Sequence, residues 1–189
     1  MVEVKKTANV MGDNRIIYLS GDFNEDKAKS VITQMLAFDA SDATKDILLF
    51  IDSYGGQVHS LLAIHDIINL LRCDVATVCI GKAMSCGQML LMSGTKGKRF
   101  ITQNARVLVH EIATGTYGKL TDVEIDIAEG KELQKIFEKL IIKYTKVNKT
   151  TLNKLMERDS YMNAKESKDY GFIDHIITKP SDLYKKINL

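Results

Sequence analysis

Cysteine, proline and tryptophan are scarce in this sequence of 189 residues, which has three cysteines, one proline and no tryptophan. The cysteines, Cys73, Cys79 and Cys86, form no Cys-x-x-Cys pair and are odd in number, which argues against a structural zinc site and against a disulfide framework. We therefore expect no metal and no cofactor, and a reducing compartment suits the chain best.

The sequence also lacks an excess of charge of one sign and has no long apolar run. The 26 basic and 24 acidic side chains are spread along the chain and give a formal net charge of +2, which excludes a basic stripe for nucleic acid or an anionic membrane. No apolar run approaches the roughly 18 residues that cross a bilayer, and the start MVEVKKTANV lacks the apolar core of a signal peptide. We expect a soluble, cytoplasmic protein with neither nucleic acid nor membrane as a partner.

Apolar periodicity along the chain predicts alternating strands and helices. Buried strands are predicted at residues 15–19, 46–51 and 75–80, and helices at residues 25–38 and 58–71. Because a helix joins each strand to the next, the strands should lie parallel in one sheet that carries helices on its faces. The predicted fold class is therefore α/β.

The longest helical pattern covers residues 121–147, and Thr121 and Glu124 have the spacing of a capping box at its start. A helix of roughly 27 residues would extend about 40 Å, which is more than a domain of this size can cover alone. We therefore expect this helix to pack against another chain. No repeat or linker divides the sequence, so residues 1–189 are predicted to form one domain.

Ser85 stands in GKAMSCGQM, between a predicted strand and an apolar run. A serine in this place is typical of a helix N-cap. Gly81 and Gly87 flank it, however, and they would allow a sharp turn that presents the serine hydroxyl at the N-terminal end of a helix. The pair Gly55-Gly56 in DSYGG is usually a turn, but it could also direct backbone N–H groups at an oxyanion. Both interpretations of Ser85 stay open at this point.

A serine nucleophile needs a general base, and His110 is the best candidate. It follows a short predicted strand at residues 106–109, where active-site residues of open α/β sheets collect. Spacing cannot choose the orienting acid among Asp122, Asp159 and Asp174. The chain order of serine, histidine and then aspartate also differs from the familiar triads. The residues by themselves indicate no more than a serine hydrolase.

Four blocks of the sequence together resemble the proteolytic subunit of the Clp protease family. They are DILLFIDSYGG, GKAMSCGQMLLMSGTKGKRF, RVLVHE and MERDSYMNAKESKDYGFID, and they match in order from about Ile16 to Ile177. The resemblance implies a crotonase-like, ClpP-type α/β fold of repeated ββα and βαβ units with a long, protruding handle helix. It also implies a serine endopeptidase with Ser85 as nucleophile, His110 as general base and Asp159 as orienting acid.

The same resemblance implies an assembly and partners. Two stacked seven-membered rings would enclose a chamber, and an ATP-driven unfoldase of the AAA+ type would feed it with unfolded polypeptides. The helix at residues 121–147 matches the handle that joins the rings. Backbone amides of Gly56 and Cys86 match the oxyanion donors of the family, and Arg158 matches a residue that contacts an acid across the ring interface, here Asp122.

Apolar pockets on the ring face dock the unfoldase in this family. The matching positions here are Leu48, Phe50, Leu70, Val78, Phe100 and Ile177. The chain departs from the family in lacking its usual prolines at Tyr54, Gln103 and Ile112, and in placing the polar Thr102 near the pocket. Only residues 1–14 precede the first predicted strand, where the family has a gating segment. We therefore expect a divergent member that responds weakly to an unfoldase.

Two other function classes remain open from the sequence. One is a non-catalytic or accessory subunit of a mixed Clp ring, against which the presence of Ser85, His110 and Asp159 argues. The other is an acyl-CoA enzyme of the crotonase superfamily, which would use the Gly55-Gly56 turn as an oxyanion hole without a serine nucleophile.

Overall fold

The computed structural model describes residues 14–189, so the expectation for the N-terminal segment 1–14 falls almost wholly outside the described residues. The first half of the chain alternates strand and helix: β1 (Ile16–Ser20), α2 (Glu25–Ser41), β2 (Ile47–Ser53), α3 (Val58–Leu70), β3 (Val75–Met84) and α4 (Cys86–Met92). The second half contains β4 (Arg99–Thr102), β5 (Arg106–Val109), α5 (Leu120–Tyr144), α6 (Lys149–Met156), β6 (Ser160–Met162), α7 (Ala164–Asp169), β7 (His175–Ile177) and α8 (Ser181–Tyr184).

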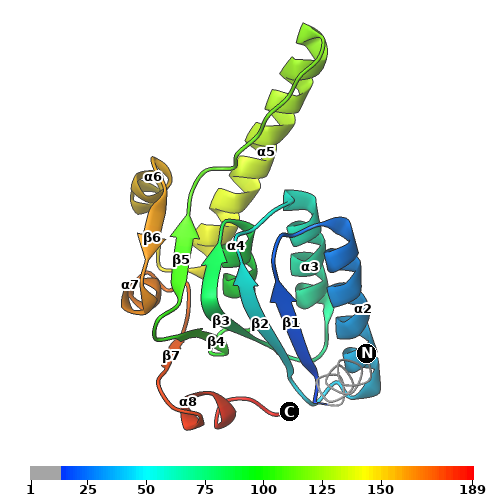
Figure 1. Cartoon of the computed structure of the whole chain (residues 1–189), viewed down its shortest axis with the longest axis vertical. Coiled ribbons are helices and arrows are strands. Elements are labelled where there is room, and N and C mark those ends of the chain that lie inside the picture. Colours follow the sequence, from blue (N-terminus) through cyan, green and yellow to red (C-terminus); the bar gives the residue numbers. More distant parts are fainter. Residues whose placement is uncertain (1–13) are drawn as a thin grey trace.

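The seven strands form one mostly parallel sheet, as predicted, in the order β1-β2-β3-β4-β7. The sheet forks at β3, whose residues 77–79 pair with β4 and whose residues 82–84 pair with β5. β6 then adds to β5 in the antiparallel direction, so β5 and β6 form a second branch (Figure 1).

Gly81 lies at the fork. The strand predicted from the sequence ended too early at this point. The predicted strand ended at residue 80, whereas β3 continues to Met84. Gly81 has a φ of +62°, and a Cβ atom built on it would lie 2.9 Å from the Asp52 carboxylate. A glycine therefore bends the strand here and does not end it, because it adopts positive φ without steric cost.

Apolar side chains are buried on both faces of the sheet. Successive residues of a strand point to opposite faces. The main core lies on one face under α2, α3 and α4, and all seven residues of α4 are buried in it. The other face carries a separate group, here called the distal cluster: Leu48, Ala76, Val78, Phe100 and Leu183.

The helix α5 projects far from the rest of the molecule (Figure 1). It has 25 residues, of which only Phe137 and Ile141 are buried, and large apolar side chains on its projecting half, such as Leu120 and Ile125, are exposed. The predicted capping box was wrong, because the N-cap is Lys119 and no side chain caps the helix. Among residues 14–189, no helix combines the length and apolarity needed to cross a membrane.

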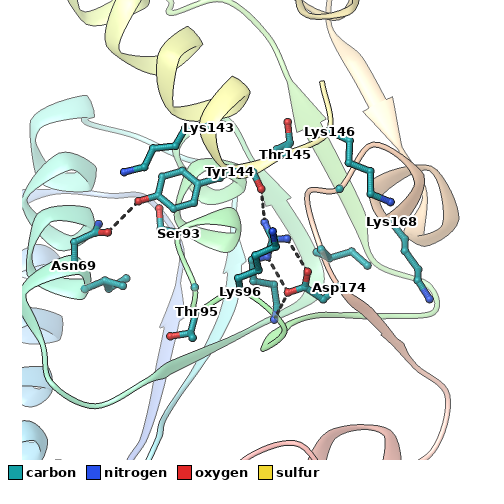
Figure 2. A pocket seen from close by; sticks show the side chains of 15 residues that line it. Asn69, Ser93, Thr95, Lys96, Lys143, Tyr144, Thr145, Lys146, Lys168 and Asp174 are labelled. Carbon is teal, nitrogen blue, oxygen red and sulfur yellow. Dashed lines mark hydrogen bonds and ion pairs between the residues drawn. The ribbon is translucent and has the colours of Figure 1, made fainter. Parts of the chain in front are cut away.

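An ion pair between buried Arg99 and partly buried Asp174 joins the base of α5 to the sheet. Arg99 on β4 binds the Asp174 carboxylate with two hydrogen bonds, of 2.9 Å from Nε and 2.7 Å from Nη2, and it also donates to the carbonyl of Tyr144 at the end of α5 (Figure 2). Burial raises the pKa of the Asp174 carboxyl, but its hydrogen bonds with Arg99 outweigh this and lower the pKa below its ordinary value. The pair therefore ties β4, the start of β7 and the handle together.

Replacing Asp174 should destabilise the fold. We expect Asp174→Asn to lower the free energy of unfolding at pH 7 by about 3 kcal/mol, because it leaves the Arg99 charge buried and unpaired. The folded-state pKa of Asp174 is lowered, so its contribution is present above the unfolded value of about 3.9 and is lost as the pH falls toward the folded value. Urea unfolding of both proteins should show the difference narrowing below about pH 4.

The exposed pair Lys165–Asp169 supplies the control, since such a pair contributes about 0–1 kcal/mol. Equal losses in Asp169→Asn and Asp174→Asn would contradict a special role for the buried pair.

Candidate active site

Ser85 occupies a sharp turn between β3 and α4. Its φ of +53° and ψ of −121° are unusual, since among residues 14–189 only Arg15 and Ser85 are non-glycine residues with positive φ. The turn is held by a hydrogen bond from the Ser85 N–H to the Leu108 carbonyl and by one from the Met89 N–H to the Ser85 carbonyl. Such backbone strain costs about 1–3 kcal/mol and is concentrated at functional sites. α4 begins directly after Ser85, but the hydroxyl makes no cap hydrogen bond.

The glycine turn after β2 lies directly against Ser85. A Cβ atom built on Gly55 would lie 2.8 Å from Ser85 Cβ and 3.1 Å from the Cys86 nitrogen, and one on Gly56 would lie 2.5 Å from the Phe23 carbonyl oxygen. Both glycines have positive φ, of +110° and +142°. Only glycine allows this close approach, which brings the backbone at Gly55 against Ser85 and the Cys86 nitrogen, with Gly56 packed against Phe23.

His110 directly follows β5, the strand beside the end of β3. Its Nδ1 atom lies 3.6 Å from Asp159 Oδ1. Its Nε2 atom is buried and, among the described residues, has no hydrogen-bond partner. His110 and Ser85 line the same small pocket, whose apolar wall consists of Met89, Ile112, Phe137, Ile141 and Met156. A buried ring nitrogen without a partner is uncommon and is a feature of catalytic sites.

Asp159 lies immediately before β6, which pairs with β5 through Val109 and Ser160. That pairing places Asp159 next to His110. Of the other two acids left open by the sequence, Asp174 is bound to Arg99 elsewhere, and Asp122 lies in the first turn of α5. Asp159 is thus the acid of the three that contacts His110.

Four neighbouring strands therefore bring these groups to one edge of the sheet. Gly56 follows β2, Ser85 follows β3, His110 follows β5 and Asp159 precedes the antiparallel β6. Chemically, the arrangement provides a hydroxyl, an imidazole with one nitrogen facing a carboxylate, and a close pair of backbone segments. These are the parts of a Ser-His-Asp hydrolase.

The Clp protease family model matches residues 2–180 of the 189. The chain belongs to the Clp protease family. The resemblance drawn from four sequence blocks and the predicted ClpP-type fold are thereby confirmed. Membership makes the protein a peptidase of the Clp type and implies an oligomeric assembly. The helix α8 and the residues after it lie outside the matched range.

The Cys86 thiol of this Clp protease family member is poorly suited to act as a nucleophile. Burial raises its pKa to about 11, and its Sγ atom donates to the Gly56 carbonyl oxygen at 3.2 Å. Burial also raises the pKa of Cys79, to about 12, and that of Cys73. Since thiolates are the reactive form, none of the three cysteines is a ready nucleophile at neutral pH.

A cavity of about 570 Å³ lies apart from Ser85 and His110. Figure 2 shows that it is lined by the Arg99–Asp174 pair together with Lys96, Lys143, Lys146 and Lys168. Its only acid, Asp174, is already paired with Arg99. In residues 14–189, moreover, no group of three or more histidine, cysteine or acidic side chains could hold a metal ion.

The residues predicted for assembly and docking are placed as follows. Neither Arg158 nor Asp122 has an ion-pair partner within the described chain. Leu48, Val78 and Phe100 belong to the distal cluster, against which Phe50 and Ile177 pack. Leu70, by contrast, lies at the end of α3 with 76% of its surface exposed, outside that cluster.

Sequence reasoning missed what covers the distal cluster. Leu183 belongs to it, and Ile187 and Leu189 pack against it. The only signal was the apolar residues in the polar end DLYKKINL, at intervals too irregular to predict a helix or a strand.

The native thiols should be unreactive. At pH 7.5 a thiol with a pKa of about 11 is ionised in roughly one molecule in three thousand. We expect iodoacetamide to leave all three cysteines of the folded protein unmodified and peptidase activity intact, while the urea-unfolded chain takes up three labels, as counted by mass spectrometry. Rapid, selective alkylation of native Cys86 with loss of activity would contradict this.

Proposed function

We propose that this protein is a serine endopeptidase that hydrolyses peptide bonds of unfolded polypeptides, with Ser85, His110 and Asp159 as its catalytic triad. One observation carries the proposal: the buried, unpartnered Nε2 of His110 lies in the pocket that Ser85 lines, while Nδ1 faces Asp159. This is the orientation that a general base requires toward a serine hydroxyl.

In the proposed reaction, His110 Nε2 takes the proton of Ser85 as Oγ attacks the carbonyl carbon of a peptide bond. Asp159 stabilises the positive charge that develops on the imidazole. The N–H groups of Gly56 and Cys86 donate to the oxyanion, and one such donor typically contributes about 3 kcal/mol in the transition state. His110 then protonates the leaving amine, and water hydrolyses the acyl-enzyme.

The surroundings of the pocket support an extended polypeptide as substrate. The connection that follows His110 runs beside α5 (Figure 1), where the Ile112 N–H donates to the Gln134 side chain at 2.9 Å. Cavities of about 340 and 240 Å³ lie between this connection and α5. The first of them shares Glu111 and Ile112 with the pocket of Ser85 and His110, so a groove leads from the triad along the handle.

The proposed assembly is two stacked heptameric rings joined through α5. The exposed apolar side chains of the projecting half of α5 support burial against another chain, because such side chains are rarely left in water as a group. Arg158 and Asp122, which have no ion-pair partner among residues 14–189 of one chain, would form an ion pair across the ring interface. An AAA+ unfoldase is the proposed partner.

Ser85→Ala should abolish peptide hydrolysis, since loss of a catalytic nucleophile lowers kcat on the order of a million-fold. Labelling by a fluorophosphonate probe should disappear with it, while sedimentation and unfolding stay unchanged. Ser30→Ala, on the exposed side of α2, is the matched control and should keep full activity. Residual turnover above roughly a thousandth of the parent rate would refute the triad, and an assembled parent protein that takes no label would favour a non-catalytic subunit or an acyl-CoA enzyme.

Arg158→Ala and Asp122→Ala should each split double rings into single rings and lower peptidase activity in parallel. Arginine binds a carboxylate through two parallel hydrogen bonds, and Arg158 adjoins Asp159, so loss of the contact should displace the triad acid. About 1 Å of displacement can cost a hundred-fold in rate. Analytical ultracentrifugation with a peptidase assay measures both effects, and Arg72→Ala at an exposed pair is the control. Intact double rings with full activity in both variants would show that Arg158 is only surface charge.

A further inference from the structure

The distal cluster lies on the sheet face opposite α2, α3 and α4. Leu48, Val78 and Phe100 are fully buried there, on three adjacent strands. Register places Phe50, Val78 and Phe100 side by side across the three strands, and it places Leu48 beside Ala76. A parallel sheet needs cover on both faces, yet α2, α3 and α4 all lie on the other one.

The cover is the end of the chain itself, residues 181–189, here called the C-terminal segment. Leu183 from α8 enters the cluster, and Ile187 and Leu189 pack against it. The last residues are tied to the turn before β2: Asn188 N–H donates to the Asp46 carboxylate at 3.0 Å, and Asp46 N–H donates to the Asn188 carbonyl at 2.6 Å.

This cover is shallow. Ile187 and Leu189 are only partly buried, and the residues between and before them, Asn188, Lys185 and Lys186, are exposed. No helix or strand continues beyond Tyr184. Segments with few buried apolar contacts and exposed backbone hydrogen bonds are the ones that open locally while the rest stays folded.

Departure of the C-terminal segment would leave no buried charge without a partner. The Asp46 carboxylate also accepts a hydrogen bond from Lys98 Nζ at 2.7 Å, so it stays paired. Asn188 is exposed, and water can replace its contacts with Asp46 and with the Thr44 carbonyl. Departure of the C-terminal segment exposes the apolar sheet face to water. An exposed apolar surface favours binding of another apolar ligand.

We propose that the C-terminal segment is a reversible, intramolecular ligand of this sheet face and excludes other ligands from it. The partner that it excludes is an extended segment with two aliphatic side chains separated by one polar residue, the chemistry that Ile187 and Leu189 present around Asn188. The segment lies beyond the part of the chain that the family model matches, residues 2–180. It bears on the proposed docking pocket, since five of those six positions lie in or against the distal cluster.

A peptide of the chain's own sequence tests the proposal. The probe is SDLYKKINL, residues 181–189, with an N-terminal fluorophore. Its binding is measured by fluorescence anisotropy to full-length protein and to a variant that lacks residues 187–189. Both carry Ser85→Ala, so the result does not depend on whether Ser85 cleaves peptides. We expect saturable binding to the truncated variant and at least about tenfold weaker binding to the full-length chain, because a ligand binds only the open fraction.

Further variants make the outcome decisive. Full-length protein carrying Ile187→Asp and Leu189→Asp should bind the probe as the truncated variant does, whereas Lys185→Asp, at an exposed position, should bind as weakly as the parent. A probe with both aspartates should not bind. Equal affinity of parent and truncated variant, or no binding to either opened variant, would overturn the proposal. So would loss of the folded state in both opened variants, because the segment would then be a permanent part of the core.

Discussion

The close approach of two backbone turns, Gly55-Gly56 after β2 and Ser85 after β3, is the constraint on which the rest of the site depends. No side chain fits between them, since a Cβ on Gly55 would lie 2.8 Å from Ser85 Cβ. Parallel pairing of β2 with β3 brings the two turns to the same edge of the sheet. The strained serine and the glycine backbone therefore form one unit, with α4 buried behind it.

The fork in the sheet completes this unit. Because β3 continues past Gly81, it can accept β5 beyond the point where β4 ends, and β5 in turn accepts β6. His110 and Asp159 are placed by these two pairings. The contact between His110 and Asp159 thus depends on strand register, and a one-residue slip would destroy it.

Local sequence patterns determined the main elements. Strong apolar periodicity predicted β1, β2, α2 and α3, and the four sequence blocks identified the family that the match over residues 2–180 confirmed. Local patterns failed where a distant group decides the outcome. β3 continues through Gly81 because glycine adopts positive φ there without steric cost and leaves room for Asp52, and α5 begins at Leu120 without the capping box that Thr121 and Glu124 suggested.

The sequence by itself therefore determined the fold class, the main elements of the first half of the chain and the candidates Ser85 and His110, because hydrophobic period and glycine spacing are encoded locally. Spacing left three aspartates open and the family resemblance indicated Asp159; the tertiary structure shows that Asp159 contacts His110, and it alone decided what covers the distal cluster. Asp159 adjoins His110 through the pairing of β5 with β6, and residues 181–189 reach Asp46 from the far end of the chain. Both contacts join residues distant in sequence, so no local pattern records them; they exist only once the strands have paired.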